Sequence, residues 1–482
     1  MKYTNPIILC DYSDPDVVRV GEDFYLTASS FNFVPGLPLL HSQDLVHWEL
    51  INYACKSIPL PGYEKVQNAK GIWAPSIRFH DGYFYIFVAT PDEGIFFTRS
   101  SDPYGEWSEL ECVWSGKGFE DPCPIWDDDG KVWLVHAYVK SRIGFNSKLG
   151  LLELDPVSLK AISEDKSIFD GSKTQPTIEG PKFYKRNGFY YIFAPAGGVT
   201  NGWQTVLRSK RIDGDYEEKI VLAQGKSRIN GPHQGGWVDT ASGEDWFVHF
   251  QDAGIFGRIV HMQPMRWVND WPVMGNAVAL EDEKALSVVG EPVESWSFPR
   301  IEKTAPASSG KTACEFQYSA NYGEQSFATT EKSLWLTPSV CTKKIDSKEF
   351  LYEKEIPLDG EWLENQRKGI IFLGNEYAAL QVTKISEKEF SVSYIESRGS
   401  EEGDTERKEV TKWSENFVAD DEVKMSVTLK MKFHAAPDGK GGVVQFSVEH
   451  QGKNSRISFK SQPFTTTNAH WVGGRYGWFG KT

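Results

Sequence analysis

The feature that most constrains this chain is a β-hairpin pattern that recurs five times along its N-terminal part. The clearest copy lies in residues 177–193, where Asn187-Gly188 is the signal of a type I′ turn between two aromatic-rich strands. The five copies begin, in chain order, at Asp14, Ala74, Asp121, Glu179 and His233. Hairpins that recur every 47 to 60 residues are typical of propeller blades, which pack as four-stranded sheets around a central channel. The sequence therefore predicts an all-β chain that begins with a five-bladed β-propeller.

The residue that heads each copy is expected to start the innermost strand of its blade, at one end of the central channel. Three of the heads are carboxylates, namely Asp14, Asp121 and Glu179. An isolated Asp-Pro pair such as Asp14-Pro15 is explained equally well as part of a turn. Because we expect all three carboxylates to occupy the same blade position, the repeat predicts that they converge on one site.

The pattern changes after the repeats. Apolar residues alternate strictly from Val423 to Phe433, and this period of two predicts a half-buried strand. Short strands of this kind, separated by polar turns and without a helical period, predict a β-sandwich of jelly-roll type. We therefore expect a catalytic propeller at 1–290, a linker at 291–311 and an accessory sandwich at 312–482.

Composition excludes several kinds of partner. The net charge of −14 opposes binding to nucleic acids and to anionic membrane surfaces. The longest apolar runs have the length of strands, so we expect no membrane insertion. Aromatic residues make up 13% of the chain, most of which β-structure explains; some could stack on sugar rings.

The N-terminus and the cysteines bear on the compartment. The first ten residues lack the apolar core of a signal peptide. We expect a cytoplasmic protein if this N-terminus is native, and a periplasmic or secreted protein if a signal peptide has been removed. The cysteines show no Cys-x-x-Cys spacing, so we expect mostly buried thiols and no structural zinc. They are Cys10, Cys55, Cys112, Cys123, Cys314 and Cys341.

Three converging carboxyl groups suit the cleavage of a glycosidic bond. This reaction needs a carboxylic acid that protonates the leaving oxygen and a carboxylate that activates water or attacks directly. Glu179 is the candidate acid, because the apolar flank of Ile178 and Pro181 favours a protonated carboxyl. Asp14 is the candidate base, and Asp121 is the candidate modulator, since a like charge nearby raises the pKa of an acid.

The motifs around these residues resemble glycoside hydrolase family 43, in particular its β-xylosidase and α-L-arabinofuranosidase branch. The matching motifs are Ser13-Asp14-Pro15-Asp16, Gly71-Ile72-Trp73-Ala74-Pro75, Glu120-Asp121-Pro122, Ile178-Glu179-Gly180-Pro181 and Gly257-Arg258. The C-terminal part, with its closing segment 471–474, is similar to the β-sandwich of many members. The resemblance covers the propeller and implies a five-bladed fold with an inverting mechanism.

The resemblance also implies a function. Asp14 matches the family's general base, Asp121 its pKa modulator and Glu179 its general acid. We expect an exo-acting hydrolase that releases terminal β-D-xylose or α-L-arabinofuranose from xylan-derived or arabinose-containing oligosaccharides. An inverting mechanism predicts that the carboxyl groups of acid and base lie ~6.5–9.5 Å apart.

Four further residues match binding positions of the family. Phe31 and Trp73 match aromatic residues that line the pocket, although a place in the strand core explains them equally well. Arg258 matches an arginine that contacts sugar hydroxyls and the catalytic carboxylates. His233 matches a histidine near the propeller axis that holds water or a calcium ion in some members. Its local sequence departs from the usual form, so we expect a buried histidine satisfied by backbone, and no required cofactor.

Alternatives remain at this stage. A carbohydrate-binding propeller without catalysis is one, although it has no need of an acid in an apolar niche. A retaining fructan-type hydrolase is another, but Gly180 after the acid and Pro15-Asp16 after the base depart from its signatures. A related five-bladed glycosidase acting on another plant or host glycan is a third. The sequence leaves open xylose against arabinose, the linkage and the oligomeric state.

Overall fold

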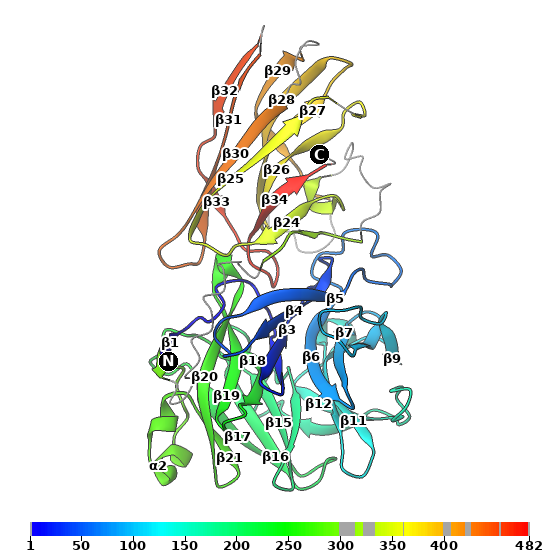
Figure 1. Cartoon of the computed structure of the whole chain (residues 1–482), viewed down its shortest axis with the longest axis vertical. Helices are drawn as coiled ribbons and strands as arrows, with labels where there is room; N and C mark the ends of the chain where they lie inside the picture. Colours follow the sequence, from blue (N-terminus) through cyan, green and yellow to red (C-terminus); the bar gives the residue numbers. More distant parts are fainter. Residues whose placement is uncertain are drawn as a thin grey trace.

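The computed structural model describes residues 2–297, 314–321, 333–359, 361–398, 406–419, 426–452 and 455–480. In these residues nearly all regular structure is β-sheet, and the α-helices are the short α1 (Lys140–Ile143) and α2 (Asp282–Ser287). The sheets form two bodies stacked along the long axis of the molecule, with the N-terminal strands in one and the C-terminal strands in the other (Figure 1). The predicted all-β fold class is confirmed.

Five four-stranded antiparallel sheets of consecutive strands make up the N-terminal body. The first blade contains β2 (Asp16–Val20), β3 (Asp23–Thr27), β4 (Gly36–Ser42) and β5 (Glu49–Cys55). The second contains β6 (Trp73–His80), β7 (Tyr83–Thr90), β8 (Gly94–Ser100) and β9 (Glu111–Ser115). The third contains β10 (Phe119–Trp126), β11 (Val132–Tyr138), β12 (Lys148–Leu154) and β13 (Lys166–Asp170).

The fourth blade contains β14 (Lys182–Arg186), β15 (Phe189–Ala196), β16 (Trp203–Ser209) and β17 (Glu217–Ala223). The fifth contains β18 (His233–Asp239), β19 (Asp245–Asp252), β20 (Arg258–Val268) and β21 (Trp271–Met274). The first strands of the first four blades contact one another in order, β18 of the fifth blade contacts β15 of the fourth, and β18 also contacts β2 of the first. The five blades therefore close into a ring around the first strands, which is the predicted propeller.

The predicted hairpin of the fourth blade shows how local chemistry builds each repeat. Arg186 pairs with Phe189 across the end of β14 and β15. The two turn residues, Asn187 and Gly188, have φ values of 50° and 74°. A type I′ turn requires positive φ at both positions, and Asn-Gly adopts it at low cost. The turn therefore fixes the register of the strands that carry the core.

The C-terminal body is a sandwich of two antiparallel sheets. The larger contains, in spatial order, β23 (Gln317–Tyr318), β24 (Cys341–Lys344), β34 (Arg475–Phe479), β26 (Arg367–Leu373), β27 (Tyr377–Lys384), β28 (Glu389–Ser397) and β29 (Val410–Val418). The smaller contains β25 (Glu349–Pro357), β30 (Ser426–Ala435), β31 (Gly442–Gln451) and β32 (Arg456–Lys460), with β33 (Phe464–Thr466) beside β31. The predicted alternation is confirmed within β30, which buries Val427, Leu429, Met431 and Phe433. Val423 and Met425 lie outside the described residues.

The segment expected to be a linker begins on the propeller. β22 (Ser295–Ser297) pairs with β1 (Lys2–Thr4), so residues 295–297 are bound to the N-terminus of the chain. Residues 298–311 of the expected linker lie outside the described residues. No helix in the described ranges is long and apolar enough to cross a membrane.

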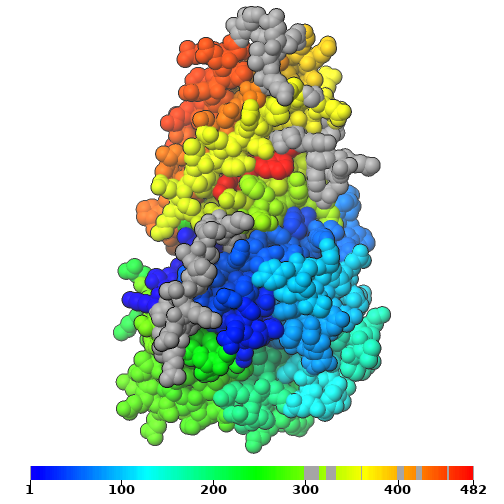
Figure 2. Space-filling model, in the orientation of Figure 1, coloured from blue at the N-terminus to red at the C-terminus, as the bar shows by residue number. Residues whose placement is uncertain are grey.

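The two bodies share a buried core and are in direct contact across a broad surface (Figure 2). The 3₁₀ helix η1 (Gly254–Phe256) of the fifth blade contributes Ile255 and Phe256 to the same apolar cluster as Phe372 of the sandwich. The amide of Gly474 donates to the carbonyl of Ile255 at 2.9 Å. The sandwich therefore packs against the segment that connects β19 to β20 in the propeller.

The cysteines differ in part from the expectation of mostly buried thiols. Cys55, Cys123 and Cys341 are buried thiols, but Cys112 is exposed. Cys10 and Cys314 form a disulfide between segments 304 residues apart, just before β2 and just before β23. A pairing over this distance joins the two bodies next to the channel, and no local spacing in the sequence indicates it.

Candidate active site

The inner strands share a backbone irregularity where they begin, at the end of the channel that faces the sandwich. One residue there has a positive φ in every blade, and the next residue is proline in the first four blades. These residues are Asp14 (φ 56°), Ala74 (26°), Asp121 (58°), Gly180 (57°) and Gln234 (34°). The pairing register shifts at the same place in β6, β10 and β18. Such bulges re-aim side chains, and here they direct them to the channel mouth.

The bulge corrects one expectation about the repeat. Asp14 and Asp121 have the positive φ, whereas Glu179 stands one residue before the positive-φ Gly180. The three carboxylates therefore do not share one blade position, because the proline after the bulge sets the alignment. The residues that precede the positive φ in blades two to five are Trp73, Glu120, Glu179 and His233.

Asp14 is buried and held by two donors. The Ser29 hydroxyl donates to its Oδ2 at 2.5 Å, and Arg258 Nη1 lies 3.3 Å from its Oδ1. Burial raises the pKa of the Asp14 carboxyl, the Arg258 guanidinium and the Ser29 hydroxyl oppose this rise, and the nearby Glu179 adds to it. Ser29 in turn accepts from the amide of Ala74 at 2.7 Å, so the hydroxyl cannot rotate freely. The aspartate thus has a fixed orientation.

Glu179 has a different partner. Its Oε1 lies 2.7 Å from Nε2 of His233, which is fully buried. The other ring nitrogen, Nδ1, has no hydrogen-bond partner among the described residues. The expectation that backbone satisfies His233 is therefore wrong, because the ring faces the carboxyl of Glu179. This contact fixes the orientation of the Glu179 carboxyl.

Asp121 is close enough to the other two carboxylates for both to act on it through charge. Its Oδ2 accepts from the amide of Gly180 at 2.7 Å and from the side-chain amide of Gln234 at 3.3 Å. Burial raises the pKa of Asp121 well above its usual value, with further rises from Glu179 and Asp14. The Gly180 contact connects Asp121 to the backbone next to Glu179. Asp121 therefore constrains the orientation of its neighbour and also acts on it through charge.

A fourth carboxyl, Glu120, joins this cluster. Burial raises its pKa well above the usual value, and Asp121, Glu179 and Asp14 raise it further, in that order. The sequence analysis quoted Glu120 within a motif but gave it no role. A signal was present, because counting back from each proline places Glu120 at the blade position of Glu179.

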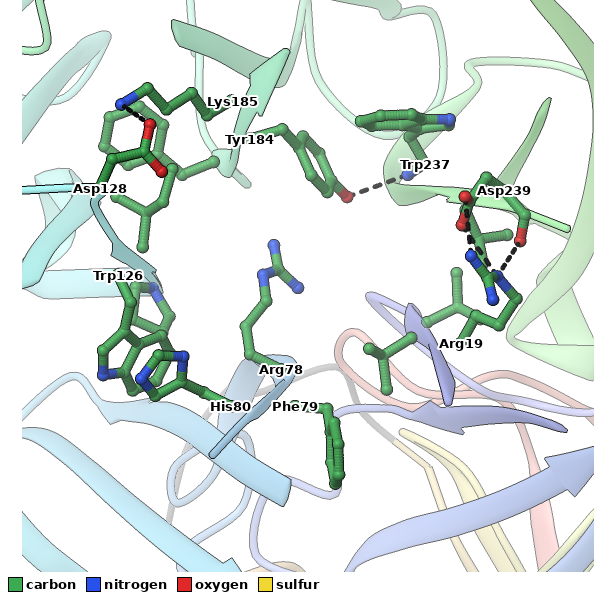
Figure 3. A pocket seen from close by; sticks show the side chains of 16 residues that line it. Arg19, Arg78, Phe79, His80, Trp126, Asp128, Tyr184, Lys185, Trp237 and Asp239 are labelled. Carbon is green, nitrogen blue, oxygen red and sulfur yellow. Dashed lines mark hydrogen bonds and ion pairs between the residues drawn. The ribbon is translucent and has the colours of Figure 1, made fainter. Parts of the chain in front are cut away.

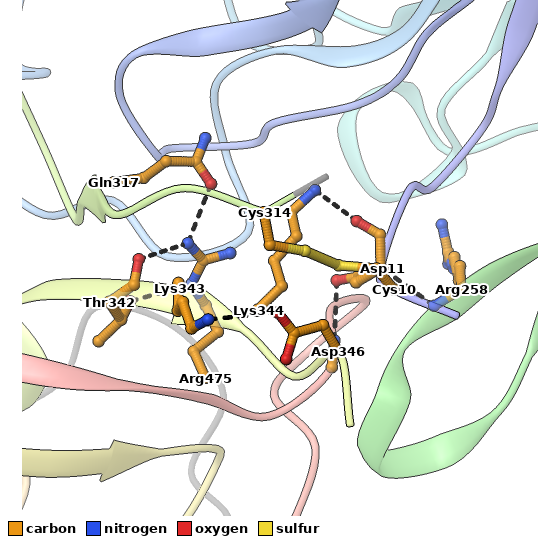
Figure 4. The surroundings of a disulfide bond; sticks show 11 residues. Cys10, Asp11, Arg258, Cys314, Gln317, Thr342, Lys343, Lys344, Asp346 and Arg475 are labelled. Carbon is orange, nitrogen blue, oxygen red and sulfur yellow. Dashed lines mark hydrogen bonds and ion pairs between the residues drawn. A yellow bond between two sulfur atoms is a disulfide. The ribbon is translucent and has the colours of Figure 1, made fainter. Parts of the chain in front are cut away.

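Arg258 is fixed from both bodies of the protein through Asp11. The amide of Arg258 donates to Asp11 Oδ1 at 2.9 Å, and the amide of Gly473 in the sandwich donates to Oδ2 at 2.9 Å. The Lys344 ammonium, also in the sandwich, donates to the carbonyl of Asp11. Figure 4 shows this junction beside the Cys10–Cys314 disulfide. Asp11 carries no signal in the sequence, because its partners lie up to 462 residues away.

Aromatic side chains cover one side of the carboxylate cluster. Phe31 and Trp73 are both buried and belong to one apolar cluster with Val472 of the sandwich. Trp471 packs edge-on against Trp73 with ring centroids 4.7 Å apart. Arg142 of α1 lies over Trp73 at 5.5 Å and is held by both oxygens of Asp92. The sandwich thus contributes an aromatic residue beside two that the sequence analysis had singled out.

A polar plug closes the channel below the carboxylates. Lys182 is fully buried and donates to the carbonyl of Pro75 at 2.7 Å and to the Ser76 hydroxyl at 2.9 Å. Asp16, also fully buried, accepts from Arg78 Nη1 at 2.7 Å. These charged groups are buried and paired inside the ring, so they fill its interior beyond the carboxylates.

A cavity of about 370 Å³ lies at that far end, lined by the C-terminal halves of the five inner strands. Arg78 projects toward its centre, with Tyr184 on one side and the stacked rings of His80 and Trp126 on another (Figure 3). The Arg19–Asp239 ion pair closes a further side. None of the residues predicted for the site lines this cavity.

His233, a position that holds calcium in some members of the family, does not belong to a metal-ligand set among the described residues. In the described ranges no group of three or more His, Cys, Asp or Glu side chains could hold a metal ion. Nε2 of His233 already contacts Glu179, and its ring packs edge-on against Phe250 at 5.6 Å. Calcium prefers six to eight oxygen ligands, so the residues around His233 do not fit a calcium ion.

The arrangement provides two carboxyl groups in different settings. Asp14 is oriented by a cation and a hydroxyl, as suits a group that accepts a proton. Glu179 is partly exposed and is held by a buried imidazole, as suits a group that gives a proton to a substrate at the mouth. Pairs of titratable groups whose surroundings differ in this way are typical of acid–base catalysis.

Comparison with known sequences identifies the family of this arrangement. The sequence model of "Glycosyl hydrolases family 43" matches residues 3–272, which is the propeller. A putative β-xylosidase of Xylanibacter ruminicola is 40% identical over 70% of this chain and 62% of its own length. A non-reducing end α-L-arabinofuranosidase of Bacteroides ovatus is 32% identical over 57% of this chain and 53% of its own length. The matched region thus spans between a half and two thirds of these relatives.

Solved structures share the whole architecture. A xylan β-1,4-xylosidase of Bacillus halodurans matches 99% of this chain and 96% of its own, with a TM-score of 0.74 and 21% identity. The protein BlXynB of Bacillus licheniformis matches 100% of this chain and 97% of its own, with a TM-score of 0.76 and 21% identity. At this identity the likeness concerns the fold, and it includes both the propeller and the sandwich.

Proposed function

The chain belongs to glycosyl hydrolase family 43, and from this premise we propose that it is an inverting exo-glycoside hydrolase that releases terminal pentoses. The sugars are β-D-xylose, α-L-arabinofuranose or both, taken from xylan-derived or arabinose-containing oligosaccharides. The observation that carries the proposal is the meeting of Asp14, Asp121 and Glu179 at one channel mouth, each with its own partners. Similarity to relatives named β-xylosidase and α-L-arabinofuranosidase supports the choice of sugar.

Each carboxyl group has a role in the proposed mechanism. Glu179 protonates the oxygen of the leaving group and regains a proton from solvent water, to which its side chain is partly exposed, while its contact with His233 holds the carboxyl in place. Asp14 accepts a proton from the water that attacks the anomeric carbon from the opposite face. Arg258 and Ser29 hold Asp14 in one orientation and favour its charged form. Asp121 orients the segment that carries Glu179 through the amide of Gly180.

The exo-acting mode is supported by the shape of the channel. The plug formed by Lys182, Asp16 and Arg78 lies below the carboxylates, and Trp471 lies beside the aromatic wall. A polysaccharide therefore cannot pass through the ring. A chain end can enter the mouth, where the terminal sugar meets the acid and the base.

The test compares aryl glycosides with good and poor leaving groups. Wild type is expected to hydrolyse aryl β-D-xylopyranosides, aryl α-L-arabinofuranosides or both. Glu179→Gln should lose at least ~10²-fold in kcat on a poor leaving group and much less on a dinitrophenolate, which needs no proton. Asp14→Asn should lose activity on both, because the attacking water still needs a base. Glu283→Gln, an exposed change on α2, is the control.

Product stereochemistry tests the mechanism separately. Proton NMR at early times should show α-xylose released from a β-xyloside. Release of β-xylose would contradict inversion, and absence of turnover on all glycosides together with sugar binding would favour the carbohydrate-binding alternative.

A further inference from the structure

We propose that Glu120 is a fourth functional residue of this site and that its carboxyl hydrogen-bonds a ring hydroxyl of the terminal sugar. The inference rests on the proposed function and adds a specificity-determining residue to it. The acid, base and modulator positions are already occupied by other residues. Glu120 would therefore contact the sugar without taking part in bond cleavage.

The position of Glu120 in its blade is the first argument. It directly precedes the positive-φ Asp121, as Trp73 precedes Ala74 and Glu179 precedes Gly180. Trp73 and Glu179 both face the mouth of the channel, where Trp73 packs against Trp471 and Glu179 meets His233. The repeated bulge thus places Glu120 on the same ring of side chains, between the aromatic wall and the acid.

The lack of a partner is the second argument. Asp14, Asp121 and Glu179 each have a hydrogen bond of 2.7 Å or shorter. No hydrogen bond or ion pair to the carboxyl of Glu120 exists among the described residues. Glu120 is only partly buried, so water can pair with its carboxyl in the free protein, and a hydroxyl that enters the mouth can replace that water.

The electrostatic surroundings are the third argument. Burial raises the pKa of Glu120, three carboxylates raise it further, and the Arg142 guanidinium, which is engaged with Asp92 over Trp73, opposes the rise. A protonated carboxyl can both donate to and accept from one hydroxyl, whereas a carboxylate only accepts. Glu120 can therefore pair with a hydroxyl in either protonation state, without the chain supplying a second cation.

A purely electrostatic role is the competing explanation. In that case Glu120 would act on Asp121 and Glu179 through charge and touch no substrate. Glu120→Gln separates the two, because an amide keeps the ability to hydrogen-bond but removes the ionisable group. Under the proposal Glu120→Gln keeps most of the activity, whereas Glu120→Ala loses roughly 10- to 100-fold in kcat/KM, mainly through KM.

The decisive experiment is a double-mutant cycle in which the Glu120 side chain and single hydroxyls of the sugar are removed separately and together. Aryl glycosides of the preferred pentose and of its monodeoxy analogues are assayed with wild type, Glu120→Ala and the control Glu111→Ala, an exposed residue of β9 in the neighbouring second blade. Deleting one particular hydroxyl should lower kcat/KM at least ~10-fold in wild type and in the control. The same deletion should leave the kcat/KM of Glu120→Ala almost unchanged. Equal costs in all three proteins, for every hydroxyl, would overturn the inference.

The outcomes also separate this inference from the proposed function. If wild type hydrolyses no glycoside, the proposed function fails. If wild type is active but no hydroxyl couples to Glu120, the proposed function stands and this inference fails. Circular dichroism and the thermal midpoint of each variant show whether it folds; if Glu120→Ala does not, Glu120→Met supplies the apolar arm of the cycle.

Discussion

Replacing Gly180 by alanine tests whether the bulge of the fourth blade positions the acid beside it. Gly180 has a φ of +57°, and an added Cβ would lie 2.7 Å from Cγ and 2.9 Å from Cδ of Gln234. Gln234 is buried and donates to Asp121. The new methyl group must therefore displace a side chain that belongs to the carboxylate cluster.

The expected cost has two parts. A non-glycine residue in the left-handed region costs ~1–2 kcal/mol, and overpacking adds ~1–3 kcal/mol, so Gly180→Ala should lose ~2–5 kcal/mol of stability. Gly188 offers a matched control, because its φ is +74° and nothing lies within 4 Å of an added Cβ. Gly188→Ala should lose the backbone part alone.

Thermal unfolding and turnover measure the two effects. A chain of two bodies need not unfold in one step, so we compare transition midpoints under identical conditions. Gly180→Ala should have the lower midpoint and should lose on the order of 10²-fold in kcat, because small displacements of catalytic groups are costly. Gly188→Ala should keep wild-type kcat. Equal midpoints and equal kcat in the two variants would refute the reasoning.

Two further predictions concern charge. Arg258 lowers the pKa of Asp14, so Arg258→Ala should move the acidic limb of the kcat/KM profile to higher pH, and Arg258→Lys should restore part of the shift; an unmoved limb would show that Asp14 is not the titrating base. Burial and Glu179 raise the pKa of Asp121 well above its usual value, so the wild type should lose stability as pH rises from the ordinary carboxyl range through that raised pKa. Asp121→Asn lacks this loss, so its midpoint relative to wild type should increase with pH; a difference independent of pH would contradict the assignment.

The blades were predictable because their signals are local. Asn187-Gly188 determines a turn and a register by itself, and β30 shows its buried face through strict alternation. Glu179 lies one residue before the blade position of Asp14 and Asp121. Aligning the repeats by their carboxylates hides this offset. Aligning Pro15 with Pro181 would have revealed it, since the proline follows the strained residue in both blades.

The partners of the site residues were not predictable in the same way. His233 reaches Glu179 across 54 residues, and Asp11 reaches Gly473 across 462. Such contacts depend on how the blades close into a ring and on where the sandwich docks. The sequence of one repeat determines neither the closure of the ring nor the position of the sandwich, because each repeat determines only its own sheet.

The groups that fill the ring below the carboxylates affect how substrate enters the site and how product leaves it. Lys182 and Asp16 are buried and paired inside the ring beyond the carboxylates, so the carboxylates are reached from the end that faces the sandwich. Under the proposed function, each freed sugar must leave through the opening by which the next chain end arrives. The enzyme must then dissociate from the shortened chain after each hydrolysis. The released pentose in solution competes with new substrate for the same opening.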